Sequence, residues 1–327
     1  MSNLILHGGD VADLLSRHPD APRPLIDLST GINPWPYPRD IAEEALTRLP
    51  QRAADEACRA AMAAYLSTQP ESILLTPGTQ IAISLLPFLI KKSRIAIASP
   101  TYGEHAPGWN AAGHEVKETP RGKIQEEDAD ILILTNPNNP DGAETIPAAL
   151  HAIAKRQAER GGFLILDEAF ADVSAHLSLA AHAGEEGLII LRSFGKFFGL
   201  AGLRLGGVLA PPTILEKLKA ALGPWPVSGP ALAVGAAAYG DTDWISATRD
   251  KLKEEATGLD SILDRAGLHV IGGTPLFRLA ADPGAQTVHA RLAEAGLHVR
   301  RFEYEKTWLR FGLPPDTAAK ERLIAAL

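Results

Sequence analysis

Short apolar runs alternate with helical patterns along the middle of the chain, and this alternation constrains the fold more than any other feature. The runs at residues 131–134 (ILIL) and 188–191 (LIIL) contain no polar side chain. Strands buried on both faces have this character, because helices cover both sides of a parallel sheet. The sequence therefore predicts an α/β fold with a mostly parallel sheet flanked by helices. The expected strands are residues 73–75, 94–98, 114–117, 131–134, 163–166, 188–191 and 205–209, with helices at 53–65, 81–90 and 147–159 among those between them.

The two ends of the chain differ from this middle part. The first residues are rich in glycine, proline and turn signals, which is typical of an irregular arm. After Pro211-Pro212, long helical patterns are followed by short, well-separated strand patterns. A chain of 327 residues is also long for a single core. We therefore predict an N-terminal arm at 1–38, a large domain at 39–212 and a small α+β C-terminal domain at 213–327.

The composition argues against several classes of function. The net charge of −7 provides no basic face for nucleic acid. Cys58 is the only cysteine, which excludes an internal disulfide and a thiolate-rich metal site, and no metal is expected. No signal peptide or membrane-spanning run is found, so we expect a cytoplasmic protein with no membrane contact. Cys58 is expected in the core, and His105 and His114 on the surface or in loops.

A lysine follows the apolar run at 188–191. Lys196 lies between Gly195 and two phenylalanines, a setting in which desolvation lowers an ammonium pKa and leaves an amine able to form a Schiff base with an aldehyde. Ser193 and Arg204 flank it and are suited to hold a phosphate. Lysine, aldehyde and phosphate together point to pyridoxal 5′-phosphate (PLP). For an isolated SxxK pattern, a solvated lysine beside a structural arginine is the better interpretation.

Further polar residues follow other predicted strands, where ligands of parallel sheets bind. Gly78-Thr79-Gln80 opens a helix whose N-terminus favours an anion, or is a simple helix start. Asp167 ends an apolar strand, either as the partner of a cofactor pyridine nitrogen or as a helix cap. Asn139 is suited to bond an oxygen of a planar ring, or it serves only an Asx turn. Tyr102 is suited to stack on such a ring, or it packs in the core. Each motif is weak alone, but their order and spacing favour a cofactor site.

In this order the motifs resemble the fold-type I PLP-dependent enzymes of the class I/II aminotransferase superfamily, along nearly the whole chain. The resemblance implies that the cofactor phosphate is bound by Gly78, Thr79, Gln80, Ser193 and Arg204. It implies that Tyr102 stacks on the ring, Asn139 bonds to its hydroxyl oxygen and Asp167 pairs with its nitrogen. It also makes Lys196 the Schiff-base lysine and Arg310 the ligand of the substrate α-carboxylate, which suits a planar guanidinium.

A narrower resemblance lies in the arm and directly after the apolar run at 163–166. The segments HGGD (7–10), LSTGINP (28–34) and DEAF (167–170) are similar to those of the threonine-phosphate decarboxylases of cobalamin biosynthesis. These enzymes convert L-threonine O-3-phosphate into (R)-1-amino-2-propanol O-2-phosphate and carbon dioxide. The resemblance implies that the substrate, a phosphorylated amino acid, is contacted by His7, Asn33, Arg300 and Arg310, with Arg301 as the alternative to Arg300.

The chain departs from its relatives at two positions. Phe170 stands where the related histidinol-phosphate aminotransferases carry a tyrosine, and Leu49 stands where the superfamily often supplies a tyrosine to the neighbouring subunit's cofactor. Phe170 and the arm favour the decarboxylase, but no motif reports which bond of the α-carbon is broken, so an aminotransferase acting on histidinol phosphate or another amino acid is the alternative. A catalytically silent PLP-binding regulator is a third hypothesis. Because the arm cannot form its own core, we also predict a homodimer with active sites at its interface.

Overall fold

The computed structural model describes residues 8–327 and divides the chain into two compact units. The small unit contains residues 8–36, 140–142 and 246–327, and the large unit contains residues 37–139 and 143–245. No helix among residues 8–327 is both long enough and apolar enough to cross a membrane.

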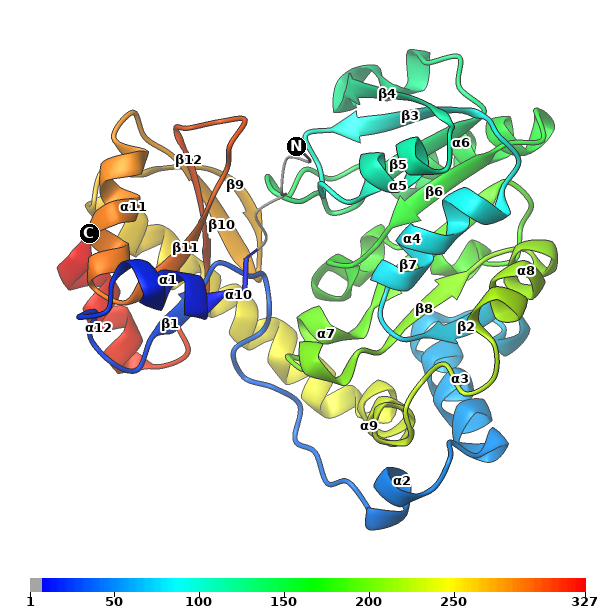
Figure 1. Cartoon of the computed structure of the whole chain (residues 1–327), viewed down its shortest axis with the longest axis horizontal. Helices are drawn as coiled ribbons and strands as arrows, with labels where there is room; N and C mark the ends of the chain where they lie inside the picture. Colours follow the sequence, from blue (N-terminus) through cyan, green and yellow to red (C-terminus); the bar gives the residue numbers. More distant parts are fainter. Residues whose placement is uncertain (1–7) are drawn as a thin grey trace. The chain divides into compact units, whose positions relative to one another are not determined.

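The large unit is built on a seven-stranded sheet in the order β2-β8-β7-β6-β5-β3-β4 (Figure 1). Its strands are β2 (Ile73–Thr76), β3 (Arg94–Ser99), β4 (Glu115–Pro120), β5 (Ile131–Thr135), β6 (Phe163–Asp167), β7 (Leu188–Ser193) and β8 (Gly206–Leu209). Strands β3 to β7 pair in parallel, whereas β8 runs antiparallel between β2 and β7. Each predicted strand is present, and the predicted α/β fold is confirmed.

Helices cover this sheet because its strands are apolar on both faces. The helices of the large unit are α2 (Glu43–Thr47), α3 (Arg52–Leu66), α4 (Gln80–Leu89), α5 (His105–Ala111), α6 (Pro147–Glu159), α7 (Phe194–Phe197), α8 (Pro212–Leu222) and α9 (Gly229–Gly240). Alternate strand residues such as Ile131, Ile133 and Ile165 pack with Leu86 of α4 and Leu218 of α8 in one buried cluster. This is the spacing of two expected of a strand.

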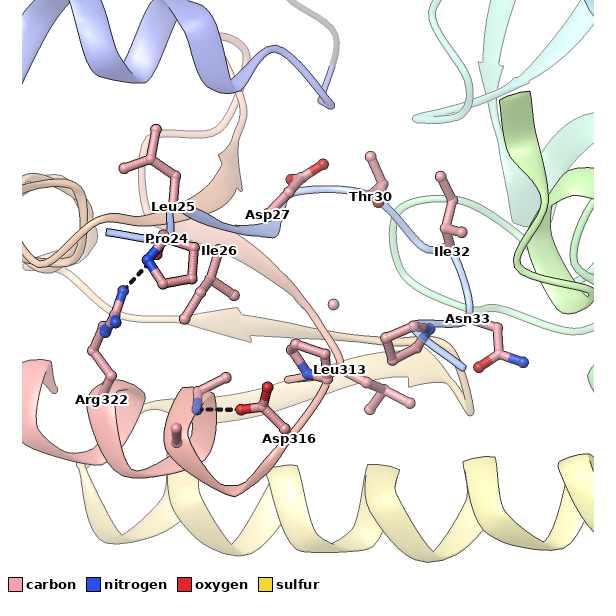
Figure 2. A pocket seen from close by; sticks show the side chains of 15 residues that line it. Pro24, Leu25, Ile26, Asp27, Thr30, Ile32, Asn33, Leu313, Asp316 and Arg322 are labelled. Carbon is pink, nitrogen blue, oxygen red and sulfur yellow. Dashed lines mark hydrogen bonds between the residues drawn. The ribbon is translucent and has the colours of Figure 1, made fainter. Parts of the chain in front are cut away.

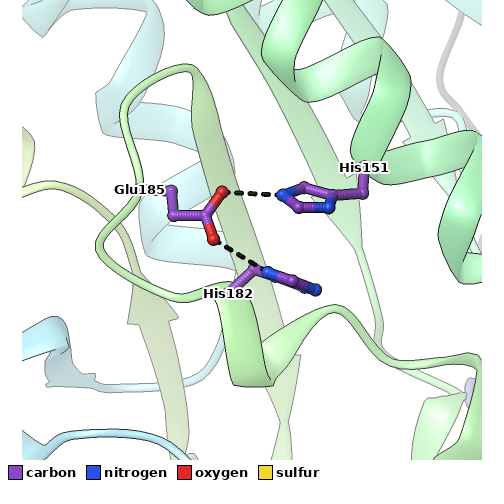
Figure 3. Close-up of side chains that lie close together, drawn as sticks. All are labelled: His151, His182 and Glu185. Atoms are coloured by element: carbon purple, nitrogen blue, oxygen red, sulfur yellow. Dashed lines mark hydrogen bonds and ion pairs between the residues drawn. The ribbon is translucent and has the colours of Figure 1, made fainter.

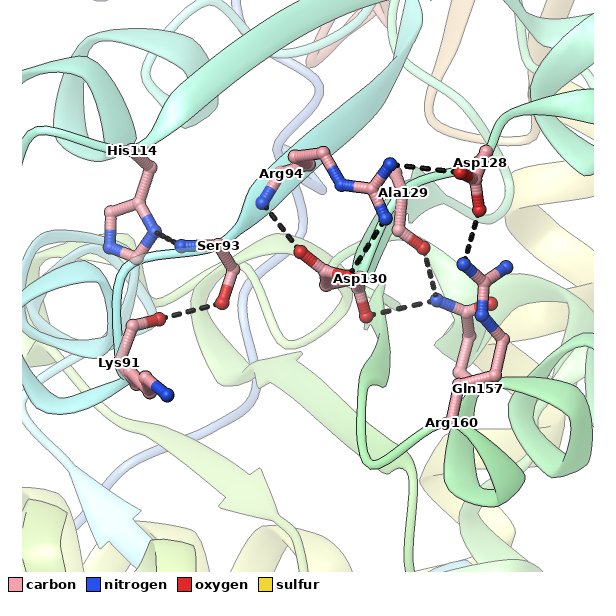
Figure 4. A network of polar contacts seen from close by, with 9 residues as sticks. All are labelled: Lys91, Ser93, Arg94, His114, Asp128, Ala129, Asp130, Gln157 and Arg160. Atoms are coloured by element: carbon pink, nitrogen blue, oxygen red, sulfur yellow. Dashed lines mark hydrogen bonds and ion pairs between the residues drawn. The ribbon is translucent and has the colours of Figure 1, made fainter.

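A polar network joins the amino-terminal ends of β3 and β5 to α6 (Figure 4). Arg94 pairs with Asp128 and Asp130 at 2.8 and 3.2 Å, and the Gln157 amide donates to the carbonyls of Ala129 and Asp130. His114 is buried beside it. The His114 Nδ1 accepts from the Ser93 amide at 3.1 Å, so its Nε2 donates to the Pro87 carbonyl at 2.7 Å. His114 was expected on the surface or in a loop, and it lies in the loop before β4 but is buried there.

The small unit contains a five-stranded sheet in the order β1-β11-β12-β10-β9. Its strands are β1 (Ile26–Leu28), β9 (His269–Thr274), β10 (Phe277–Ala281), β11 (Leu297–Arg301) and β12 (Trp308–Gly312), and its helices are α1 (Val11–Arg17), α11 (Ala285–Glu294), α12 (Thr317–Ala326) and most of α10 (Thr242–Arg265). Strand β1 pairs in parallel with β11, with Ile26 opposite Leu297. The start of the chain is thus part of a sheet and not only an irregular arm.

The bounds of the two units are not the predicted domain bounds. Helix α9 packs along α3 in the large unit, where a Cβ on Gly235 would lie 2.8 Å from the Cys58 sulfur. Residues 213–245 therefore belong with the large unit. Helix α8 packs in the buried cluster of the large sheet, and α9 packs along α3. Cys58 is fully buried as predicted, and burial raises the pKa of its thiol to about 12. The division into an arm at 1–38, a large PLP-binding domain at 39–212 and a small domain at 213–327 stays a prediction.

Candidate active site

The strand ends of the large unit bring the predicted cofactor residues to one edge of the sheet. Thr135, Asp167 and Ser193 are the last residues of β5, β6 and β7, and Thr135 pairs directly with Asp167. On the other side, Gly206 of β8 pairs with both Ser193 and Thr76, the last residue of β2. Neighbouring strands lie about 4.8 Å apart, so the turn after β2 and the turn after β7 are close.

Two glycines allow a tight cradle at this edge. Gly78 has a φ of +77°, and a Cβ there would lie 2.5 Å from Nη2 of Arg204. A Cβ on Gly206 would lie 2.9 Å from the Thr79 nitrogen. The Arg204 guanidinium therefore lies directly against the backbone that leads into α4, and it donates to the Ala201 carbonyl at 3.1 Å.

The cradle has the donors that an anion requires. The first amides of α4 lie at a helix N-terminus, and the Thr79 hydroxyl makes no capping hydrogen bond to them. On the β7–β8 side, the Arg204 guanidinium lies against Gly78, and Ser193 is paired with Gly206 through the backbone. Helix amides together with a guanidinium form a site for a phosphate dianion. The large unit thus brings the predicted phosphate residues together.

A series of hydrogen bonds and one ring contact leads from this cradle to Asp167. The Tyr102 hydroxyl donates to Oε1 of Gln80 at 2.9 Å, and the Tyr102 ring meets the His105 ring edge-on, with centroids 5.9 Å apart. His105 Nε2 lies 3.1 Å from Oδ2 of Asp167, whose Oδ1 accepts from the Ala169 amide at 3.0 Å. Because an ionised carboxylate only accepts, the proton between them lies on His105 Nε2.

His105 is the residue that the sequence analysis missed. It was expected on the surface or in a loop, but it is the first residue of α5, is 2% exposed and contacts Asp167, which is 3% exposed. A buried carboxylate is costly unless it is hydrogen-bonded, so this contact offsets the cost of burying Asp167 and fixes the direction of its side chain. The only signal in the sequence is the spacing of three residues between Tyr102 and His105, which is too common to identify the pair.

The loop after β5 is held by Asn138. Its side chain donates to the Pro100 carbonyl at 3.0 Å and accepts from the Thr101 hydroxyl at 3.0 Å. The Thr101 hydroxyl also lies 2.8 Å from the Thr135 hydroxyl. These contacts fix the loop against the ends of β3 and β5, and Asn139 follows directly with a half-buried side chain.

Lys196 lies on α7, which starts immediately after Ser193. Phe194, Phe197 and Phe198 are fully buried, and the rings of Phe194 and Phe198 stack with centroids 4.4 Å apart. Gly195 is required, because a Cβ there would lie 2.6 Å from Cα of Ala201. The aromatic anchors leave Lys196 half-buried, with Nζ 5.7 Å from the centroid of the Phe170 ring.

A buried ionic network supports the segment after β6. Glu168 accepts from Arg192 at 2.8 Å, from the Ser178 hydroxyl at 2.5 Å and from the Leu179 amide at 2.7 Å. Arg192 also pairs with Asp172. Burial opposes the charge of Arg192, but the two carboxylates outweigh it and raise the pKa of the guanidinium. The only sequence signal for this network is Arg192 itself, an arginine directly after the apolar run at 188–191. A charge in such a buried position needs an oppositely charged partner.

The small unit places two arginines side by side. Arg300 of β11 pairs with Arg310 of β12, and residues directly opposite on antiparallel strands share one face of a sheet. Arg310 is 7% exposed, donates to the Ser29 carbonyl at 2.8 Å and lies 4.9 Å from the Phe277 ring centroid. Burial, assisted by the charge of Arg300, lowers the pKa of Arg310 to about 10. Two neighbouring guanidinium groups favour an anionic ligand.

Arg301 points to the opposite face, since side chains alternate along a strand. It lies 3.8 Å from Glu303 in an ion pair. Arg300 and Arg310 therefore lie on one face of the sheet, and Arg301 lies on the other face.

The other two predicted substrate residues have different positions. Asn33 is buried, and its Oδ1 accepts from the Trp35 amide at 2.9 Å. His7 lies outside the described residues, and its neighbour Gly8 packs against Ser29.

Asn33 also lines a cavity of about 420 Å³ within the small unit (Figure 2). Its charged lining includes Asp316, which caps α12 through the Ala319 amide, and Arg322, which donates to the Pro24 carbonyl. Neither Arg300 nor Arg310 lines this cavity. The hydrogen bonds of Asp316 and Arg322 thus serve the fold, and the paired arginines lie elsewhere in the unit.

Comparisons with known proteins agree with this geometry. The aminotransferase class I and II family model matches residues 24–327. The chain is 46% identical to the threonine-phosphate decarboxylase of a Sinorhizobium species, over 100% of this chain and 98% of that one. It is 41% identical to the threonine-phosphate decarboxylase of Pseudomonas aeruginosa, over 99% of this chain and 97% of that one.

A solved structure supports the fold. The histidinol-phosphate aminotransferase from Sinorhizobium meliloti, in complex with pyridoxal-5′-phosphate, superposes with a TM-score of 0.82 at 19% identity, covering 99% of this chain and 94% of that one. The family match spans most of the sequence, and the two relatives match along its whole length. The chain therefore belongs to the aminotransferase class I and II family.

Proposed function

We propose that the chain is a PLP-dependent threonine-phosphate decarboxylase, which forms (R)-1-amino-2-propanol O-2-phosphate and carbon dioxide from L-threonine O-3-phosphate in cobalamin biosynthesis. The observation that carries the proposal is the 46% identity over the whole chain to a protein of that name. The pair Arg300 and Arg310 supports it, because threonine phosphate presents two anionic groups and guanidinium binds both carboxylate and phosphate in a bidentate way.

The residues at the sheet edge fit PLP. The cradle closed by Gly78 and Gly206 excludes side chains and offers helix amides, which suits the cofactor phosphate. We assign that phosphate to Gly78, Thr79, Gln80, Ser193 and Arg204. When bound, PLP withdraws electrons from the α-carbon of an amino acid. Lys196 is assigned as the covalent attachment point.

Three further residues are assigned to the cofactor ring. Asp167 accepts hydrogen bonds from the Ala169 amide and from His105. These bonds orient it to accept a further hydrogen bond from a protonated ring nitrogen. Tyr102 is assigned to the ring face and Asn139 to the ring oxygen. Phe170 has no hydroxyl and instead provides an apolar surface next to the Lys196 amine.

For the substrate we assign the α-carboxylate to Arg310 and the phosphate to Arg300, with Asn33 and His7 as further contacts. Although its pKa is lowered to about 10, Arg310 still carries its charge at neutral pH. A bound carboxylate would offset the cost of burying that charge. Arg301 is directed to Glu303 and is not assigned to the substrate.

The alternative activity is transamination, and one experiment separates the two. Purified PLP-loaded protein is incubated with threonine phosphate without any 2-oxo acid, and carbon dioxide and the amine product are measured. A decarboxylase releases the two in equal amounts. Amino transfer that requires a 2-oxo acid, with no carbon dioxide, would identify an aminotransferase.

We also propose a cytoplasmic homodimer formed through an apolar patch on the large unit. Leu46, Leu49 and Trp225 are 67%, 60% and 56% exposed, and Gly229 at the start of α9 packs against Ala45, the neighbour of Leu46. Large exposed apolar side chains on neighbouring segments are typical of an interface. Sedimentation should give a dimer for the natural protein and a monomer for a Leu46→Asp, Leu49→Asp variant. A fully active monomer would contradict the proposal.

A further inference from the structure

A cluster of two histidines and a glutamate lies in the large unit (Figure 3), and none of the three is among the residues assigned to PLP. His151 comes from α6, and His182 and Glu185 come from the segment that leads into β7. This segment precedes β7 at its amino-terminal end, whereas Ser193 and Lys196 follow its carboxyl-terminal end. The cluster therefore lies at the opposite edge of the sheet from the candidate active site.

The Glu185 carboxylate joins the two imidazoles of the cluster. The Glu185 carboxylate lies between the imidazoles, with one oxygen 2.7 Å from His151 Nε2 and the other 2.8 Å from His182 Nδ1. The rings are stacked, with centroids 3.7 Å apart and planes inclined by 28°. One potential ligand atom from each residue lies within 4.8 Å of the other two.

We propose that His151, His182 and Glu185 bind a divalent transition-metal ion of the zinc class. Tetrahedral Zn²⁺ with bonds of about 2.0–2.1 Å to two nitrogens needs them roughly 3.3 Å apart, so the stacked rings must tilt until His151 Nε2 and His182 Nδ1 both face the ion. The metal takes the place of the two protons that the imidazoles now share with Glu185. Each imidazole then carries its proton on the other ring nitrogen, which keeps both rings neutral.

The ligand set selects the type of ion. Two imidazoles and one carboxylate suit Zn²⁺, Co²⁺ or Ni²⁺, whereas Mg²⁺ and Ca²⁺ prefer oxygen ligands alone. The His151, His182 and Glu185 side chains are 19%, 38% and 45% exposed, so an ion can enter and water can complete its coordination. No metal was expected from the sequence, because that expectation considered the single cysteine and not this cluster, in which His151 is distant in the chain from His182 and Glu185.

The position of the cluster indicates a structural role for the ion. It would join α6 to the segment between β6 and β7, which is also fastened by the bonds of Ser178 and Leu179 to Glu168. Glu168 follows Asp167 directly, and the segment leads into β7, which is followed by α7 and Lys196. An ion at this place therefore stabilises the connection between two strands of the candidate active site without touching it.

The test uses untagged, PLP-loaded protein freed of metal with a chelator. Calorimetric titration with Zn²⁺ should give one ion per chain, and Co²⁺ should give the visible absorption of a nitrogen-coordinated site. His151→Ala and His182→Gln should each weaken Zn²⁺ binding by at least tenfold, and Glu185→Gln is a near-isosteric third variant. His176→Ala is the matched control, since His176 is an exposed histidine of the same segment outside the cluster, and it should bind Zn²⁺ as the natural protein does.

Thermal unfolding provides a second measurement. Saturating Zn²⁺ should raise the melting temperature of the natural protein and of His176→Ala by several degrees, and leave His182→Gln unchanged. Mg²⁺ should shift none of them. The proposal is overturned if the natural protein binds no Zn²⁺ more tightly than His182→Gln does. It is also overturned if the three variants lower the stability of the metal-free protein but keep its zinc stoichiometry, because the cluster is then a hydrogen-bonded contact only.

Discussion

Replacing His105 by phenylalanine tests the network behind the candidate active site. Phenylalanine keeps an aromatic ring beside Tyr102 but removes the Nε2 proton that Asp167 accepts at 3.1 Å. Asp167 is almost fully buried, and within this network only the Ala169 amide would still donate to it. A hydrogen bond to a buried charge contributes about 1.5–3 kcal/mol, which corresponds to roughly a 10- to 150-fold change.

We therefore expect His105→Phe to lower kcat by one to two orders of magnitude and to release PLP more readily on dialysis. His105→Gln, which restores a donor, should recover part of both losses. The control is His114→Phe, which removes another buried histidine of the large unit, bonded to Ser93 and Pro87 instead of Asp167. It should lower the free energy of unfolding but keep kcat per folded molecule. Full kcat and full PLP retention in folded His105→Phe would refute the reasoning.

Three further predictions concern the large unit. Lys196→Ala should abolish the borohydride-reducible attachment of PLP and lower activity by orders of magnitude, and attachment that persists would mean that another amine carries it. Asp167→Ala should still bind PLP, seen by absorbance, but should keep less than about a tenth of the rate, a barrier increase of at least roughly 1.4 kcal/mol. Gly235→Ala should destabilise the protein by about 1–3 kcal/mol in denaturant titration, because the new methyl group meets the Cys58 sulfur. Gly240→Ala lies in the same helix, where an added Cβ meets open space, and it should not destabilise the protein. Equal losses of stability in the two variants would argue against a clash at Gly235.

The parts of the fold that the sequence predicted well are those set by local pattern. The buried runs that became β5 and β7 appear in the sequence as uninterrupted apolar segments, and the helix expected at 53–65 is observed as Arg52–Leu66. The residues at the strand ends were predictable for the same reason, since parallel strands bring their carboxyl ends to one edge.

The parts that were missed depend on distant partners. Strand β1 has three residues and exists through its pairing with β11, far along the chain. His105 and His114 carry no periodic signal, and their burial follows from partners on other strands and loops. The apolar residues of α8 and α9 predict that each helix is packed against the protein, but not which of the two units it packs in. That Arg300 rather than Arg301 shares a face with Arg310 required the register of β11 against β12.

The central claim is that this chain removes carbon dioxide from an amino acid that it recognises by its phosphate. It is tested most directly by the rate of carbon dioxide release from threonine phosphate and from threonine, in the natural protein and in Arg300→Ala. We predict that threonine is a poor substrate, and that Arg300→Ala weakens threonine phosphate binding by about 2–5 kcal/mol while hardly changing the rate with threonine. Absence of carbon dioxide from threonine phosphate, or an equal loss with both substrates, would contradict the account.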